Sequence, residues 1–300
     1  MKKHTSSTTL NGKDFINKTT FRERSKAYTR RPASFVILLL VSLSTLLTVV
    51  VLGFILFHIL SNGLPYLKSS LFALNYNSEN VSLFPSIITT LYMTALALLV
   101  STPLGIFCSI YLVEYAKRGN KVVELIRLAT ETLAGIPSIV YGLFGLLFFV
   151  TALHWGYSLM AGTFTLAIMI LPLIIRSTEE ALKSVPETYR EASFGLGTGK
   201  LRTVFKIALP AAAPGILAGV ILAIGRIVGE TAALIYTSGT VAQIPGSLLD
   251  SGRTMAIHMY ALSSEGLHTG QAYATGVVLL IVVLILNTVS SIIAKKIAKV

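Results

Sequence analysis

The chain has 300 residues, of which 53% are hydrophobic and only 13% are charged. This charged share is about half that of an average globular protein, so the composition excludes a soluble domain built around one large core. The net charge of +12 would be compatible with nucleic-acid binding, but its distribution along the chain favours a different explanation, given below. The single cysteine, Cys108, excludes a disulfide within the chain.

The N-terminal region changes from polar to apolar near residue 33. Residues 1–33 are rich in Ser, Thr, Lys and Arg, and we expect them to form a disordered basic tail. The apolar run at 34–60 is too long for the core of a signal peptide, and no A-x-A cleavage site follows it. This run therefore predicts a first transmembrane helix that stays attached to the protein.

Residues 84–293 predict a transmembrane domain, because five further apolar segments are long enough to cross a bilayer. The predicted spans are 84–112, 130–151, 162–180, 210–236 and 271–293. Prolines fall within or at the starts of these spans, at Pro103, Pro137, Pro172, Pro210 and Pro214. Membrane helices tolerate proline because their neighbours satisfy the freed backbone groups. The predicted fold class is an all-α integral membrane protein with about six transmembrane helices.

Basic residues predict the orientation of the chain. The tail, 113–129, 176–208 and the C-terminal end contain nine, four, six and three Lys or Arg, whereas the intervening loops contain two in total. The positive-inside rule therefore places both termini in the cytoplasm. We expect the membrane to be the cytoplasmic membrane of a prokaryote. These cations would face anionic lipid headgroups, so the net charge requires no nucleic acid as a partner.

The predicted cytoplasmic segment 181–209 contains closely spaced glycines but lacks the pattern of a nucleotide site. A P-loop ending at Lys200 would need a glycine where the chain has Phe194 and a hydroxyl where it has Leu201. Ser184 and Glu187 match a capping box, which predicts a short helix at 185–194. We expect a bend at Gly195 or Gly197, and then a second short helix that ends at Pro210. This helix–bend–helix is interpreted as a docking element, with a plain surface connector as the alternative.

The same segment resembles the EAA motif of ABC importer permeases. The matching residues are Glu191, Ala192, Ser193, Gly197, Ile207, Leu209 and Pro210. Ser193 departs from the motif, which usually has alanine there, by one small side chain for another. The resemblance implies a type I ABC importer permease architecture, in which this element is a coupling helix that docks on a separate ATPase subunit. It also implies that this chain is no enzyme and has no cofactor of its own, since ATP binds to the partner.

Two arginines are candidates for a substrate path, because charges inside a membrane mark such paths. Arg226 would lie about 24 Å along the helix from Pro210, near the bilayer middle, with Glu230 four residues further on the same face. The pair is either a structural ion pair or a site where an oxyanion displaces Glu230 from the arginine fork. Arg176 either lines the path or snorkels to the headgroups, and Glu131 is either its partner or an interfacial carboxylate.

A narrower resemblance covers residues 81–293. The segments 102–106, 137–144 and 225–234 look like the phosphate-specific (Pst) permeases, with the A-type subunit the closer match. This resemblance implies import of phosphate together with a C-type permease subunit, two ATPase subunits and an extracytoplasmic phosphate-binding protein. It also implies roles in transport for Arg176, Arg226 and Glu230.

Other functions stay open at this point. Molybdate, tungstate and sulfate share the oxyanion geometry of phosphate. An ion-driven secondary transporter would need no ATPase, although the inverted repeats usual in that class are not evident. A scaffold subunit with no substrate path is a third alternative. The five histidines show no ligand spacing, so no metal site is expected.

Overall fold

The computed structural model describes residues 32–117 and 119–297, so most of the predicted tail lies outside the described residues. Every regular element in the described part is helical. The chain divides into two units, Met1–His58 and Ile59–Val300. In the first unit, α2 (Pro32–Gly63, which continues into the second unit) exposes nearly all of its apolar side chains, as a helix surrounded by lipid would.

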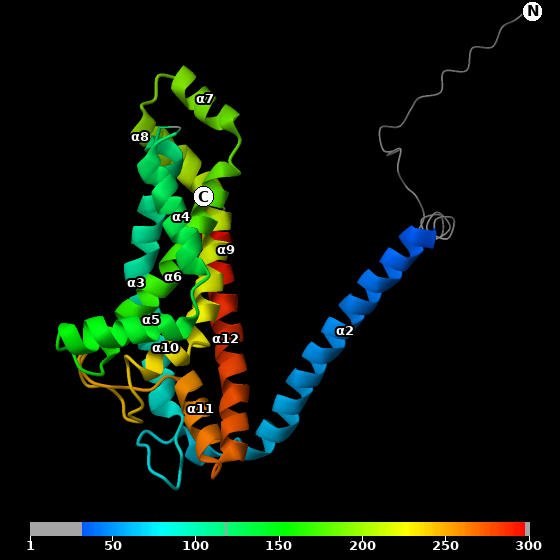
Figure 1. The fold of residues 1–300 in the computed structure, drawn as a ribbon, viewed down its shortest axis with the longest axis vertical. Coiled ribbons are helices and arrows are strands. Elements are labelled where there is room, and N and C mark those ends of the chain that lie inside the picture. The colour runs from blue at the N-terminus through cyan, green and yellow to red at the C-terminus, as the bar shows by residue number, and fades with distance from the viewer. Residues whose placement is uncertain (1–31, 118, 298–300) are drawn as a thin grey trace, which may run out of the picture. The chain divides into compact units, whose positions relative to one another are not determined.

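The second unit is built around long apolar helices that pack along one another (Figure 1). They are α3 (Phe84–Ile110), α6 (Leu159–Lys183), α9 (Leu209–Val228) and α12 (Thr269–Ile297). Helix α6 lies between α3 and α9, and α9 packs on α12. The helices approach closely because small residues face them: a Cβ atom at Gly219 would overlap Ser177 of α6, and one at Gly215 would overlap Ala181. The predicted all-α membrane fold is confirmed.

Among the residues that the structure describes, five helices are long and apolar enough to cross a membrane, and a bent pair makes a sixth candidate. The span predicted at 130–151 is broken by a sharp bend in the structure. Helix α4 (Lys121–Ala134) meets α5 (Ser138–Gly145) and its π-helical continuation η4 (Leu146–Ala152) at 104°. Pro137 explains the break, because it has no N–H to donate and keeps the preceding residue out of the helical region.

The predicted boundaries around Pro210 are also wrong. Helices α8 (Lys200–Thr203) and α9 are joined by the π-helical turn η5 (Val204–Ala208), so one helix runs through Pro210 instead of ending there. The wider π turn relieves the clash that a proline ring makes with the carbonyl four residues earlier. At its other end, α9 stops at Val228 rather than at 236, and α10 (Ala232–Ile235) is a separate short helix.

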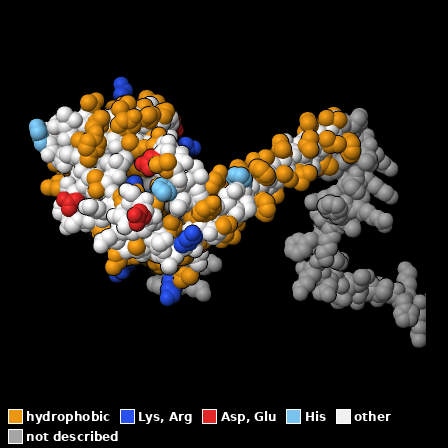
Figure 2. Space-filling model, turned by 90° about the horizontal axis from the view of Figure 1, so that it is seen from below, with side chains coloured by type: hydrophobic (Ala, Val, Ile, Leu, Met, Phe, Trp, Pro, Cys, Tyr) orange, Lys and Arg blue, Asp and Glu red, His pale blue; other side chains and the backbone are white. Residues whose placement is uncertain are grey.

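The end of the second unit opposite α7 (Glu187–Gly195) is closed by loops and by α11 (Met255–Glu265). The loop at 236–254 covers the start of α6, where the Leu159 N–H donates to the Asp250 carbonyl at 2.8 Å. It also reaches α3, where Met255 N–H donates to Thr90 Oγ1 at 2.9 Å. Figure 2, which views the molecule from this end, shows scattered charged side chains rather than a basic patch.

His258 of α11 lies outside the candidate membrane spans and is fully buried. Burial lowers the pKa of its imidazole from 6.5 to about 3; the positive charge of Arg253 adds to this shift, and a polar contact with the Val81 backbone opposes it. The folded chain therefore keeps this histidine neutral at pH values where the unfolded chain protonates it.

This difference predicts how stability depends on pH. Above the pKa that histidine has in the unfolded chain, His258 does not change the free energy of unfolding. Below that pKa, the free energy of unfolding falls by up to about 1.4 kcal/mol for each pH unit, until the pH reaches the pKa of the folded state. We expect the melting temperature of the purified complex to fall between pH 7 and pH 5, and His258→Gln to flatten that dependence. His268→Gln, at the same end, is the control and keeps the native slope. A native slope in His258→Gln contradicts the prediction.

Candidate coupling segment and substrate path

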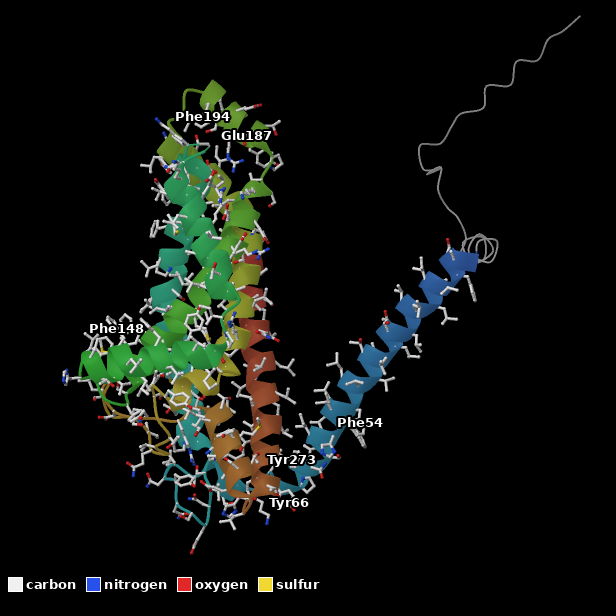
Figure 3. All side chains as sticks on the ribbon, in the orientation of Figure 1. Phe54, Tyr66, Phe148, Glu187, Phe194 and Tyr273 are labelled. Atoms are coloured by element: carbon white, nitrogen blue, oxygen red, sulfur yellow. The ribbon has the colours of Figure 1, made fainter. Side chains whose placement is uncertain are left out.

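Helix α7 forms the tip of the second unit, where Figure 3 labels Glu187 and Phe194. The predicted capping box at Ser184 and Glu187 is wrong. Ser184 ends α6 instead, and its hydroxyl donates to the Ala181 carbonyl at 2.8 Å. Pro186 occupies the N-cap position of α7, and its extended backbone separates the two helices.

The bend after α7 is made by Gly197, one of the two predicted positions. Its φ of +77° lies in the left-handed region, where a side chain is strained and glycine is not. The Thr198 N–H donates to the Ser193 carbonyl at 3.1 Å, and the Gly197 N–H donates to Phe194 at 2.9 Å, so the bend satisfies the last carbonyls of α7. A Cβ atom at Gly197 would meet no other atom within 4 Å, so the requirement for glycine is conformational.

Gly197→Ala is therefore expected to destabilise the bend by about 1–2 kcal/mol through backbone strain alone. We expect transport-coupled ATP hydrolysis by the reconstituted complex to fall several-fold. Gly199→Ala is the matched control, because Gly199 has extended backbone with φ of −71° and the same open space. Equal effects of the two substitutions contradict the conformational explanation.

The tip exposes a set of large apolar side chains. They are Tyr189, Phe194, Leu196, Leu201 and Phe205. Leu196, at the end of α7, is 86% exposed. Exposed apolar side chains grouped at one tip and beside charged residues are typical of a protein-binding surface rather than of a surface that faces water.

The residues of the predicted coupling motif divide between this surface and the packing beneath it. Glu191 and Ala192 are exposed on α7, and Gly197 and Pro210 are exposed as well. Ser193 is buried, and its hydroxyl lies 2.8 Å from Thr203 Oγ1, which ties α7 to α8. The remaining two, Ile207 and Leu209, are half-buried where the π turn enters α9.

A buried ion pair, which the sequence analysis did not predict, holds α7 in place. Arg190 Nη2 lies 2.8 Å from Glu114 Oε1, and both side chains are only 8% exposed. Glu114 belongs to η3 (Tyr111–Tyr115), the π-helical continuation of α3. Arg190 also donates to the carbonyls of Leu182 at 2.9 Å and Val185 at 3.0 Å, at the end of α6. One guanidinium therefore joins α3, α6 and α7.

One charged cavity lies between α4 and the tip, and a second lies between α4 and α6. The larger, of about 620 Å³, is lined by charged residues that include Glu114, Arg127, Lys183 and Arg190. The second, of about 170 Å³, shares Arg127 and Lys183 and adds Arg176. Glu179 forms ion pairs with both residues that the two cavities share, since its Oε1 lies 2.8 Å from Arg127 Nη2 and 2.7 Å from Lys183 Nζ.

Arg176, a predicted path residue, lines the smaller cavity and is largely exposed in this unit. Its Nε lies 3.1 Å from Glu180 Oε1, one helical turn away. Glu131 lines the same cavity, but no described ion pair joins it to Arg176, so of the two alternatives the interfacial carboxylate agrees with the structure. An exposed pair of this kind contributes little to stability and leaves Arg176 free to exchange partners.

Arg226 and Glu230 are separated rather than paired, and the expectation of an ion pair on one helical face is wrong. Helix α9 ends at Val228, so Glu230 lies beyond the helix that contains Arg226. Glu230 Oε1 instead accepts a hydrogen bond from the Ala233 N–H at 3.1 Å and so stabilises the start of α10. Arg226 is half-buried in the last turn of α9, where a positive charge is favoured by the helix dipole.

Comparison with known proteins agrees with this geometry. The family model described as "Binding-protein-dependent transport system inner membrane component" matches residues 101–299, about two thirds of the chain. The chain belongs to this family. The match includes the whole of the coupling segment, from α6 through α7 to α9, together with both charged cavities. The predictions of an ABC importer permease and of a multi-pass membrane protein are confirmed.

Two relatives and one solved structure describe the place of the chain within the permease family. "Probable ABC transporter permease protein YqgI" of Bacillus subtilis (strain 168) is 37% identical over 212 residues, 65% of this chain and 72% of that protein. "Phosphate transport system permease protein PstA" of Pasteurella multocida (strain Pm70) is 34% identical over 249 residues, 79% of this chain and 85% of that protein. Because such relatives are permease subunits, the prediction that this chain is no enzyme is also confirmed.

The solved structure shares the fold of the permease family with this chain. It is a bacterial alginate ABC transporter in complex with an alginate pentasaccharide-bound periplasmic protein. The match has a TM-score of 0.67 at 14% identity and covers 91% of this chain and 98% of that chain. At this identity the likeness concerns the fold alone.

Proposed function

We propose that this permease forms half of the membrane pore of an ATP-driven importer of inorganic phosphate in a prokaryotic cytoplasmic membrane. The observation that best supports coupling to a separate ATPase is the tip of α7, which exposes Leu196 while the buried Arg190–Glu114 pair fixes the helix beneath it. Closure of two ATPase subunits on bound ATP would move this tip, and the ion pair would pass the movement to α3 and α6.

Phosphate is proposed as the substrate on two grounds. The chain is 34% identical to a protein named as a phosphate transport permease. In addition, Arg176 and Arg226 present guanidinium groups whose planar forks match the oxygens of a phosphate ion. In this proposal an extracytoplasmic phosphate-binding protein delivers the ion, a C-type permease subunit supplies the other half of the path, and Glu230 holds the chain next to Arg226.

The test is uptake of radiolabelled phosphate by proteoliposomes that contain the complete complex and its binding protein. We expect uptake to require ATP and to resist competition by molybdate, tungstate and sulfate. Uptake of one of those anions in preference to phosphate would support the other oxyanion permeases. Phosphate uptake driven by an ion gradient without ATP would support a secondary transporter and contradict the proposal.

A further inference from the structure

A buried arginine lies at the end of the second unit opposite α7, outside the residues of the proposed path. Arg253 precedes α11 and is only 6% exposed. Its backbone N–H donates to the Val241 carbonyl at 2.9 Å, which fixes the residue beneath the 236–254 loop. An arginine side chain stays charged at every physiological pH, so this end of the protein contains a permanent buried cation.

This cation lacks a counterion among the described residues. Nε and Nη2 of Arg253 are both buried without a hydrogen-bond partner, and no described carboxylate lies within 4.0 Å of the guanidinium. The nearby acid of the same loop, Asp250, accepts hydrogen bonds from the backbone N–H groups of Gly246 and Ser247 instead. A buried charge without a partner is strongly unfavourable, so a site that keeps one is suited to an anion.

Two further side chains surround the guanidinium. The ring of Tyr76 lies over it, with the guanidinium carbon 4.5 Å from the ring centre. The fully buried His258 meets the same ring edge-on at 6.2 Å. Tyr76 thus partly compensates the charge through its π face.

Tyr76 also lines a small cavity. It has a volume of about 290 Å³ and is lined by Tyr76, Asn75, Gln243, Ile244, Leu74 and Pro85. The amide groups of Asn75 and Gln243 supply further donors at its wall. This volume suits a small ion and a few waters better than an organic ligand. The low exposure of Arg253 also argues against docking by a carboxylate of a partner protein.

We propose that Arg253, His258 and Tyr76 form an oxyanion site in which a small anion, with inorganic phosphate as its natural occupant, displaces the ring of Tyr76 from the guanidinium. Under the predicted orientation this site faces the extracytoplasmic side, where an imported anion first meets the permease. It would hold the anion between its release by a binding protein and its passage to Arg226. The assignment of phosphate rests on the proposed function.

The experiment is equilibrium binding of radiolabelled inorganic phosphate to the complete purified complex, without ATP and without the binding protein. The complex contains Arg226→Leu, so that the site near α9 does not contribute. We expect this complex to bind phosphate, and the further substitution Arg253→Met to weaken binding at least about tenfold, since two charge-assisted hydrogen bonds are lost. The control Lys68→Met removes an exposed cation from the same end and leaves binding unchanged.

Three results would overturn the inference. They are the absence of phosphate binding in the Arg226→Leu complex, unchanged binding after Arg253→Met, and an equal loss after Lys68→Met. If the methionine variant does not assemble, Arg253→Lys keeps the charge but loses the planar fork, and unchanged affinity in that variant overturns the site as well. Failure of the native complex to import phosphate with ATP is measured separately and concerns the proposed function alone.

Discussion

Replacing Arg190 by methionine is expected to abolish ATP-driven uptake almost completely. The substitution leaves the Glu114 carboxylate buried without its partner and frees the carbonyls of Leu182 and Val185. Loss of one partner from a buried ion pair costs about 3–5 kcal/mol. Since about 1.4 kcal/mol corresponds to a factor of ten, the correctly held α7 becomes at least about 100-fold less populated, and uptake falls accordingly.

Two further variants test whether the Arg190–Glu114 pair transmits the movement of α7 or only stabilises the folded protein. The double variant Arg190→Met with Glu114→Leu removes both charges, so it should recover much of the melting temperature of the complex. It should nevertheless remain uncoupled, with ATP hydrolysis that no longer responds to the loaded binding protein. Glu187→Gln is the matched control, because this carboxylate is 70% exposed and lies 3.2 Å from the same guanidinium. Restored coupling in the double variant would show that the pair only stabilises the fold.

Replacing Arg226 by leucine is expected to lower phosphate uptake by at least about 100-fold while the complex still assembles. The guanidinium lies in the last turn of α9, and a phosphate ion held by its fork would lose two charge-assisted hydrogen bonds of roughly 1.5–3 kcal/mol each. Arg226 forms no ion pair with another described residue, and Glu230 accepts a hydrogen bond from the Ala233 backbone instead. Leucine is therefore not expected to leave a buried carboxylate unpaired.

The control for Arg226 is Lys121→Met, which removes an exposed cation at the start of α4, outside the coupling segment and the charged cavities. Native uptake is expected for this variant. Uptake is compared with the amount of ATPase subunit that co-purifies, so that a defect in assembly is distinguished from a defect in transport. Native uptake after Arg226→Leu would favour the scaffold alternative, in which this arginine serves only to complement the helix dipole.

The sequence was sufficient to predict the features that depend on long apolar runs and local spacing. The helical spans near 34–60, 84–112 and 271–293 required only length and hydropathy, because a bilayer sets both. The bend at Gly197 could be predicted because a helix that ends in a left-handed turn selects glycine. The coupling motif was identified by its resemblance to a family motif, which is possible because its residues lie within one short segment.

Other features depend on contacts between distant parts of the chain. Glu114 and Arg190 are 76 residues apart, and neither is distinctive within its own segment. The pairing of Arg226 with Glu230 was predicted from helical spacing, which does not apply once α9 ends at Val228. The burial of Arg253 could not be predicted either, because it depends on the 236–254 loop and on Tyr76. Local pattern gives no information about such tertiary contacts.

The most direct test of coupling is site-specific crosslinking from the tip of α7 in the complete complex. Cysteine is introduced at Ala192, in a Cys108→Ala background that removes the single native thiol. Cysteine at Leu267, which is 81% exposed at the opposite end, provides the comparison. The structure predicts a crosslink from position 192 to an ATP-hydrolysing subunit and none to that subunit from position 267. Crosslinks to that subunit from position 267 alone, or from neither position, would contradict docking at α7.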